Sequence, residues 1–488
     1  MYHVYRKFAS RCGWIQMAIR LRVDSYEAGV GAVGGLATFH NNIYPRLVNR
    51  GFDVKTFSMH FRPELPTREN YRGVIIRRQS SDVDLDVAYA WTYDILHQYG
   101  IDVAYLSPSE LYVVPRYFTN FGVVPSPYRM SQADLFSPHD WMSLVRSALN
   151  AWLHPDLVQA IFIHSTEPGR IGGIRHRNID GTSEKLNLTD FELMVKGEYE
   201  GSFYQGLRLV RDLEFPLTFK ILSRQPNSAL FTVSRIHRKE YLLGLRAHGM
   251  RFGQVEDKVF AIYHGVDTKE YRPMPDVEKQ GFTIGFIGRS TPVKGIDILP
   301  ELASILVKDI PELKFHIVTK TETQNPYYLD LLARIHDMNL SDVVFVDNTF
   351  YNGEQKIKVI NSWRLALVPS RYEPQGQVDL EAMSCGVVPA VGMGGLREKV
   401  SDGFNGIWIN PYDIRETAEK IVKFYKGEYK GRKAEEIIRN CRESAEKTWD
   451  WEKRADAHKE LYTYLVDGRV DDVMRDLSEL LLPEVAKI

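Results

Sequence analysis

The chain has 488 residues, of which 44% are hydrophobic and 26% charged, a globular composition too long for one ordinary core. Its 62 basic and 63 acidic residues give a formal net charge of −1, so the charge balance does not point to nucleic acid or an anionic membrane as main partner. Three cysteines without metal-ligand spacing, no apolar leader and no run of about 18 apolar residues lead us to expect a reduced, cytoplasmic protein without a membrane span.

Strands alternate with helices along the first half of the chain, which predicts a parallel sheet covered on both faces. The first unit is a strand, a glycine-rich turn, a helix and a second strand, expected at 14–24, 25–35, 36–51 and 52–59. Further buried strands are expected at 101–107, 157–166, 228–234 and 258–267.

The same alternation resumes near residue 281. A strand, a turn, a helix and a strand are expected at 282–289, 290–295, 296–310 and 313–320, and more strands at 343–348, 365–370 and 387–392. We therefore expect an α/β protein with two doubly wound, Rossmann-like domains facing across a cleft. The expected boundaries are 1–272 and 273–452, with C-terminal helices at 453–488 packing back on the body.

Two segments of the first half fit this alternation poorly. They lie near 106–150 and 168–200 and are rich in polar residues, tyrosine, proline or glycine. They are expected to be insertions, which either shape an acceptor site or decorate the surface.

Two glutamates flank a tight turn after the strand expected at 365–370. Pro374 biases Glu373 towards an extended conformation, and Gly376 allows a ligand to approach the backbone closely. Glu381 follows on a helix that begins near Val378, whose free N–H groups face the same point. Carboxylates pair well with vicinal hydroxyls, so this stretch suits a sugar or a ribose next to a phosphate.

Cations and glycines stand at two other strand ends. Arg289 and Lys294 follow the strand at 282–289, where two cations suit a diphosphate. Gly34 and Gly35 separate a strand from a helix, so their backbone N–H groups could hold phosphate oxygens, although simple turn geometry would also explain them. His164 ends another strand, a place where a lone histidine is more often structural.

Several of these stretches resemble motifs of one family. Glu373 and Glu381 in "EPQGQVDLEAMSCGVVPAV" resemble the E-x7-E signature of retaining glycosyltransferases with the GT-B fold. "GAVGGLATF" (31–39) is similar to the N-terminal glycine-rich loop of that family, and "IGRSTPVKGIDIL" (287–299) to its donor-phosphate loop. "HDW" (139–141) and "FIHSTEPGR" (162–170) resemble segments of glycogen and starch synthases.

The resemblance implies roles for these residues. The catalytic group would be Glu373, Arg289, Lys294 and His164, with the cations stabilising the departing diphosphate and Glu373 beside the donor sugar rather than acting as a nucleophile. Donor-binding residues would be Gly34, Gly35, Gln375, Gly376, Gln377 and Glu381, and acceptor-side residues His139, Asp140 and Trp141. No metal or other cofactor is expected, because two basic side chains can balance the phosphates.

Three activities stay open. The first is a glycogen-synthase-like transfer of glucose from ADP- or UDP-glucose to an α-glucan. The second is transfer to a small acceptor, as in trehalose, sucrose-phosphate or glycerate-type synthases; Ala32 and Val33 stand where bacterial glycogen synthases carry a lysine, which leaves donor and glucan specificity open. The third is a nucleotide-sugar epimerase or a silent sugar-binding protein. The nucleotide base and the oligomeric state have no signature in the sequence.

Overall fold

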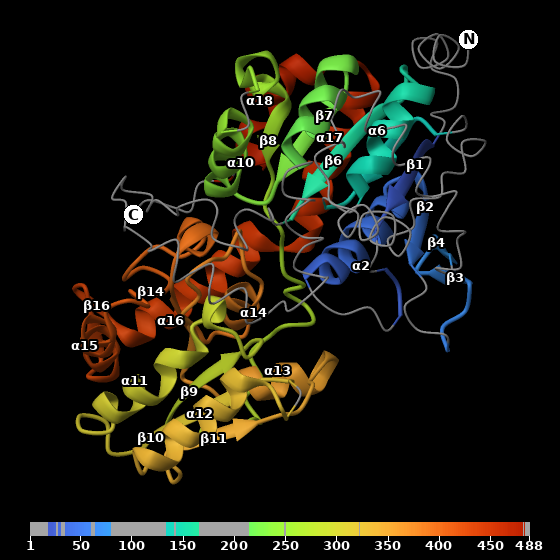
Figure 1. Cartoon of the computed structure of the whole chain (residues 1–488). Helices are drawn as coiled ribbons and strands as arrows, with labels where there is room; N and C mark the ends of the chain where they lie inside the picture. The colour runs from blue at the N-terminus through green and yellow to red at the C-terminus, as the bar shows by residue number, and fades with distance from the viewer. Residues whose placement is uncertain are drawn as a thin grey trace, which may run out of the picture.

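The computed structural model describes residues 18–25, 28–30, 35–59, 64–79, 133–140, 143–164, 214–247, 250–321, 323–481 and 483. These residues form two large, separate sheets with helices around each (Figure 1), and a two-stranded hairpin. Both sheets are built mainly from parallel strands, as the alternation of strands and helices predicts.

The first sheet has eight strands in the order β3-β4-β2-β1-β5-β6-β7-β8. Only β3 and β4 pair antiparallel among them. Burial of every residue in β5, β6 and β7 reflects cover on both faces. The strands are β1 Ile19–Asp24, β2 Phe52–Met59, β3 Arg68–Tyr71, β4 Val74–Gln79, β5 Leu135–Pro138, β6 Val158–Ile163, β7 Ala229–Thr232 and β8 Val259–Ala261, and the helices are α2 Gly35–Val48, α6 Leu144–Leu153, α10 Arg235–Ala247 and one at 214–224.

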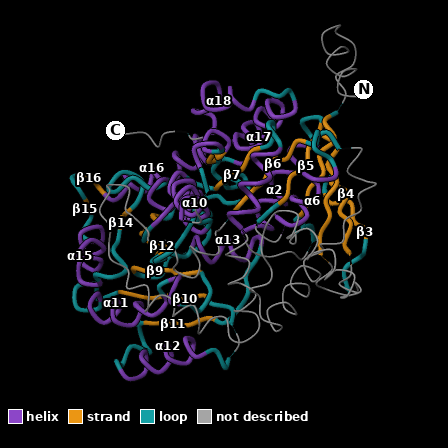
Figure 2. Tube along the Cα trace, turned by 45° about the horizontal axis from the view of Figure 1, so that its top comes forward, coloured by secondary structure: helices purple, strands orange, loops and turns teal. Residues whose placement is uncertain are grey.

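The second sheet has six parallel strands in the order β11-β10-β9-β12-β13-β14. Figure 2 shows β9, β10 and β11 side by side. The strands are β9 Phe282–Ile287, β10 Leu313–Val318, β11 Val344–Asp347, β12 Leu365–Val368, β13 Val388–Val391 and β14 Ile407–Trp408. The helices are α11 Leu299–Leu306, α12 Pro326–Asp337, α13 Gly353–Asn361, α14 Val378–Ser384, α15 Ile414–Tyr425 and α16 Ala434–Ser444, with a small hairpin of β15 Glu428–Tyr429 and β16 Arg432–Lys433.

The last two helices return to the first sheet. α17 (Trp451–Val466) and α18 (Val473–Leu481) follow the second sheet in sequence, yet their apolar side chains join the core of the first, where Leu461 and Leu465 cluster with Ile43 and Leu47 (Figure 1). The two passages of the chain between the sheets are paired: Val266 N–H donates to the Trp449 carbonyl at 2.8 Å.

The structure corrects some expected elements. Within or at the edge of the insertion expected near 106–150, Leu135–Pro138 form β5 and Leu144–Leu153 form α6 instead, and β5 lies in the middle of the first sheet between β1 and β6. The helix expected at 296–310 is a 3-10 turn at 296–298 followed by α11, whereas the C-terminal helices expected at 453–488 are present as α17 and α18. The strand expected at 101–107 and the insertion near 168–200 lie outside the described residues.

No helix in the part of the chain that the structure describes is long and apolar enough to cross a membrane.

Candidate active site

The loop between β12 and α14 holds Glu373. Gly376 in this loop has φ +88°, a conformation that other residues rarely adopt, and a Cβ there would lie 2.5 Å from the Leu396 side chain. A second glycine, Gly395, packs against the same loop so closely that its Cβ would lie 1.9 Å from the Pro374 carbonyl oxygen, and its N–H donates to the Glu373 carbonyl at 2.9 Å. Close backbone packing therefore fixes the position of this loop.

Lys294 reaches Glu373 from the neighbouring loop. β9 and β12 are adjacent parallel strands, so the loops that leave their carboxyl ends meet. The Lys294 ammonium forms an ion pair with the Glu373 carboxylate. Arg371 also pairs with Asp297 through both guanidinium nitrogens, at 2.6 and 2.8 Å, and so joins the two loops a second time.

Arg289 lies just beyond the end of β9 and is exposed. The sequence thus places both predicted phosphate-binding cations, Arg289 and Lys294, at the carboxyl edge of the second sheet, where ligands of doubly wound sheets bind.

Glu381 lies buried on α14, and Lys356 of α13 neutralises it. Their Nζ and Oε2 atoms are 2.6 Å apart. The same ammonium lies 5.9 Å from the centre of the Tyr271 ring, in the segment that joins the two sheets. Burial, with the nearby Glu381 carboxylate, raises the pKa of Tyr271. The sequence alone does not indicate that Lys356 and Tyr271 lie beside Glu381. A lysine on a short polar helix ordinarily faces solvent.

A second, fully buried ion pair lies under the loop. Asp379 and Lys399 are 2.7 Å apart and both side chains are 0% exposed. Lys399 also donates to the Gly376 carbonyl at 2.9 Å. Burial raises the pKa of Asp379 and lowers the pKa of Lys399, while each charge offsets part of this effect on the other. Neither residue stands out in the sequence, because Asp379 shares its helix with Glu381 and Lys399 follows Arg397 and Glu398.

The predicted donor-binding glutamines contact His264, in the segment that follows β8. The side-chain amide of Gln375 binds the backbone of His264, and the Gln377 amide nitrogen lies 3.3 Å from His264 Nδ1. The side chain of Gln375 is therefore engaged between the two halves of the protein.

The predicted acceptor-side residues His139 and Asp140 are buried. His139 is 0% exposed, so its ring supports His164, at 2.8 Å, instead of reaching an acceptor. The Asp140 carboxylate accepts the His164 backbone N–H at 2.7 Å. His164 itself is half-buried at the carboxyl end of β6. Burial lowers the pKa of His164 to about 3, so its ring is neutral.

Two predicted residues, Gly34 and Trp141, lie outside the described residues, and Gly35 begins α2. Among the described residues no group of three or more His, Cys, Asp or Glu side chains is placed to hold a metal ion.

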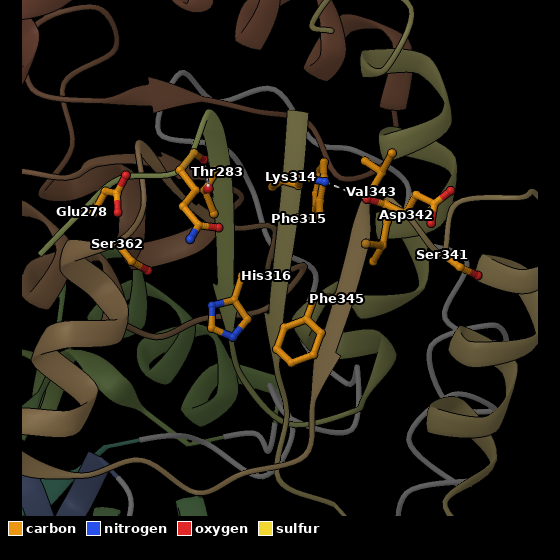
Figure 3. A pocket seen from close by; sticks show the side chains of 12 residues that line it. Glu278, Thr283, Lys314, Phe315, His316, Ser341, Asp342, Val343, Phe345 and Ser362 are labelled. Atoms are coloured by element: carbon orange, nitrogen blue, oxygen red, sulfur yellow. Dashed lines mark hydrogen bonds between the residues drawn. The ribbon is translucent and has the colours of Figure 1, made fainter. Parts of the chain in front are cut away.

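A cavity of about 390 Å³ lies elsewhere in the second half. Figure 3 shows Thr283, His316 and Phe345 around it, on β9, β10 and β11. Thr283 and Phe345 stand near the amino ends of their strands, away from the carboxyl edge that carries Lys294 and Glu373. None of the predicted site residues lines this cavity.

Known proteins resemble this chain along most of its length. Residues 267–444 match the family model of group 1 glycosyl transferases. An uncharacterised glycosyltransferase of Methanocaldococcus jannaschii is 24% identical, over 90% of this chain and 96% of its own length. A glycogen synthase of Kosmotoga olearia is 23% identical, over 65% of this chain and 74% of its own length.

The structure of a sucrose-phosphate synthase from Thermosynechococcus elongatus matches with a TM-score of 0.65 at 17% identity, covering 92% of this chain and 99% of that chain. The fold is therefore GT-B, as expected from the sequence. The matched segment 267–444 contains Arg289, Lys294, Glu373 and Glu381.

Proposed function

We propose that this protein is a retaining glycosyltransferase that transfers glucose from a nucleotide sugar to an α-glucan. The observation that carries the proposal is the Lys294–Glu373 pair, in which a cation and a carboxylate from two adjacent loops meet at the carboxyl edge of the second sheet. The match of residues 267–444 to group 1 glycosyl transferases and the glycogen synthase relative support it.

The nucleotide end of the donor would lie against Glu381. Its carboxylate suits the vicinal hydroxyls of a ribose, and the flanking Lys356 and Tyr271 side chains hold it in place. This arrangement leaves the phosphates of the donor to the loop after β9.

The leaving group would be stabilised by Arg289 and Lys294. Breaking the bond between the sugar and the phosphate develops negative charge on the diphosphate, and positioned cations stabilise that charge more in the transition state than in the ground state. The acceptor hydroxyl would attack from the face that the diphosphate leaves and pass its proton to that phosphate, which retains the anomeric configuration. Two side-chain cations balance the diphosphate, so the proposal needs no metal ion.

Glu373 would bind hydroxyls of the donor sugar in this scheme. Lys294 is paired with Glu373, so it would neutralise the carboxylate before the donor arrives. The backbone of the loop at 375–377 would complete the sugar site.

The test is transfer by purified protein. ADP-glucose, UDP-glucose and GDP-mannose are each offered with glycogen and with a panel of small acceptors. We expect elongation of glycogen from a glucose donor, α-linked product by NMR, and loss of transfer in Glu373→Ala. Glu354→Ala, on the exposed face of α13, is the control and should retain activity.

Three outcomes would contradict this proposal. Transfer only to a small sugar or acid would assign the second activity. A β-linked product would exclude retention. Epimerised donor, or tight binding of a nucleotide sugar without transfer, would place the protein in the third group.

A further inference from the structure

Three imidazole rings form a continuous line in the first half of the protein. His139 Nδ1 lies 2.8 Å from His164 Nε2, and His164 Nδ1 lies 3.1 Å from His264 Nε2. The rings come from the ends of three different segments, far apart in the sequence, around the buried ring of Phe39.

The line has a polar partner at each end. His264 Nδ1 faces the amide nitrogen of Gln377 at 3.3 Å, in the loop that also carries Glu373. At the other end, His139 Nε2 is hydrogen-bonded to the Tyr44 hydroxyl, which lies 3.1 Å from Ser137 Oγ. The line therefore joins the loop of the second sheet to the core of the first.

The number of protons on each ring determines which ring donates and which accepts along this line. Burial holds the pKa of all three histidines below its ordinary value, so each ring is neutral and carries one N–H. The Gln377 amide nitrogen can only donate, so His264 Nδ1 accepts. The proton of His264 is then on Nε2 and is donated to His164 Nδ1, and each later ring repeats this pattern.

We propose that Gln377 and His264 are positioning residues that set the tautomer of His164, so that hydrogen bonds run one way from Gln377 through His264, His164 and His139 to Tyr44. In this arrangement His164 carries its proton on Nε2 and donates it to His139. Both ring nitrogens of His164 are occupied, so a donor sugar meets its ring edge or its main chain and not a free ring nitrogen.

The role in transfer rests on the proposed function. His164 stands at the carboxyl end of β6, and its backbone N–H is already held by Asp140. Its ring is hydrogen-bonded to His264, so contact of His264 with Gln377 of the second half sets the tautomer of the His164 ring. Approach of the two halves would thus determine which nitrogen of this ring carries the proton.

The direct test determines which ring nitrogen of each histidine carries the proton. Protein labelled with ¹⁵N in its histidine rings is measured by NMR at neutral pH, with signals assigned by difference from single histidine variants. We expect His164 and His264 both protonated on Nε2. In Gln377→Glu the carboxylate can only accept, so the direction should reverse and the proton of both rings should move to Nδ1. Wild-type His164 protonated on Nδ1, or unchanged tautomers in Gln377→Glu, would overturn the proposal.

A pair of variants separates positioning from general stability. The side-chain amide of Gln reaches the position of His Nε2, whereas that of Asn reaches only the position of Nδ1. His264→Gln can therefore still donate to His164, and His264→Asn cannot. We expect transfer activity within about threefold of wild type for His264→Gln and a drop in kcat of roughly tenfold or more for His264→Asn.

Equal kcat losses in the two His264 variants would overturn the positioning role. If the wild type transfers no sugar to any acceptor, the proposed function fails, while the tautomer measurement still decides whether the hydrogen-bond line has the stated direction.

Discussion

The side chain of Gln375 pairs with the backbone of His264 as a neighbouring strand would. The His264 N–H donates to Gln375 Oε1 at 2.8 Å, and Gln375 Nε2 donates to the His264 carbonyl at 3.2 Å. Gln375 is 2% exposed, and the adjacent Pro374 carbonyl accepts a bond from Ser234 at 2.6 Å. The loop that carries Glu373 is thus fixed to the first half of the protein as well as to its own sheet.

Replacing Gln375 by Ala should destabilise the protein. Both backbone groups of His264 would lose their partners while remaining buried, at a cost of about 2–4 kcal/mol in the free energy of unfolding. Urea denaturation measures this change. Gln355→Ala, an exposed position on α13, is the control, and an equally small effect of both substitutions would refute the importance of the pair.

The buried pair of Asp379 and Lys399 should behave as a unit. Lys399→Met leaves the Asp379 carboxylate without a counter-charge in a site closed to water, so we expect a loss of about 3–5 kcal/mol in unfolding free energy. The double variant Lys399→Met/Asp379→Leu should recover most of that loss. Additive effects of the two substitutions in denaturant unfolding would show that the charges do not interact.

Lys294→Met should impair transfer far more than folding. The substitution keeps the length of the side chain but removes the charge that would face the leaving diphosphate, so kcat should fall roughly 10²- to 10³-fold. Lys308→Met, an exposed cation after α11, is the matched control. An unchanged kcat with only a higher KM for the donor would assign Lys294 to ground-state binding alone.

Gly395→Ala should displace the loop. Its Cβ would lie 1.9 Å from the Pro374 oxygen, and the three nearest atoms all belong to the backbone of Pro374 and Gln375, so we expect a loss of about 2–3 kcal/mol in stability together with reduced kcat. Gly253→Ala, where a Cβ meets nothing within 4 Å, serves as the comparison. A thermal melting temperature equal to that of Gly253→Ala would show that the loop adapts.

Acid should weaken the fold through its buried histidines. Burial lowers the pKa of His40 to about 4 and those of His164 and His458 to about 3, from the ordinary value of 6.5. Above pH 6.5 these rings are neutral in both the folded and unfolded chain, and their contribution is fully present. Below pH 6.5 the unfolded chain binds protons at these rings and the folded chain does not. The free energy of unfolding therefore falls by about 1.4 kcal/mol per pH unit for each ring.

Unfolding free energies between pH 7 and pH 5 measure that slope. His40→Gln should make this slope shallower by the contribution of one proton. A slope that does not respond to His40→Gln would contradict the assignment.

Much of the fold could be predicted from the sequence. The alternation of short apolar runs with amphipathic helices predicts parallel sheets, because only strands covered on both faces read as continuous apolar runs. Lys294 and Glu373 lie in the loops that follow β9 and β12. Because ligands of parallel sheets bind at the carboxyl edge, the sequence predicts both as site residues. These features are local, and local spacing in the chain is enough to predict them.

Other features depend on which segments meet in space. The sequence pattern places β5 and α6 in an insertion, because β5 reads Leu-Phe-Ser-Pro, with only two successive apolar residues and a proline, which is rare within sheets. No spacing reveals that Lys356 neutralises Glu381, or that Gln377 lies against His264, since those partners come from separate elements.

The sequence by itself determined most of the helices and strands, β5 and α6 excepted, and the chemistry available at the strand ends. The tertiary structure alone decided the rest. It returned α17 to the core of the first sheet, because an amphipathic pattern shows that a helix buries one face but not against which core. By the same packing, it aligned three histidines from separate segments into one line of hydrogen bonds.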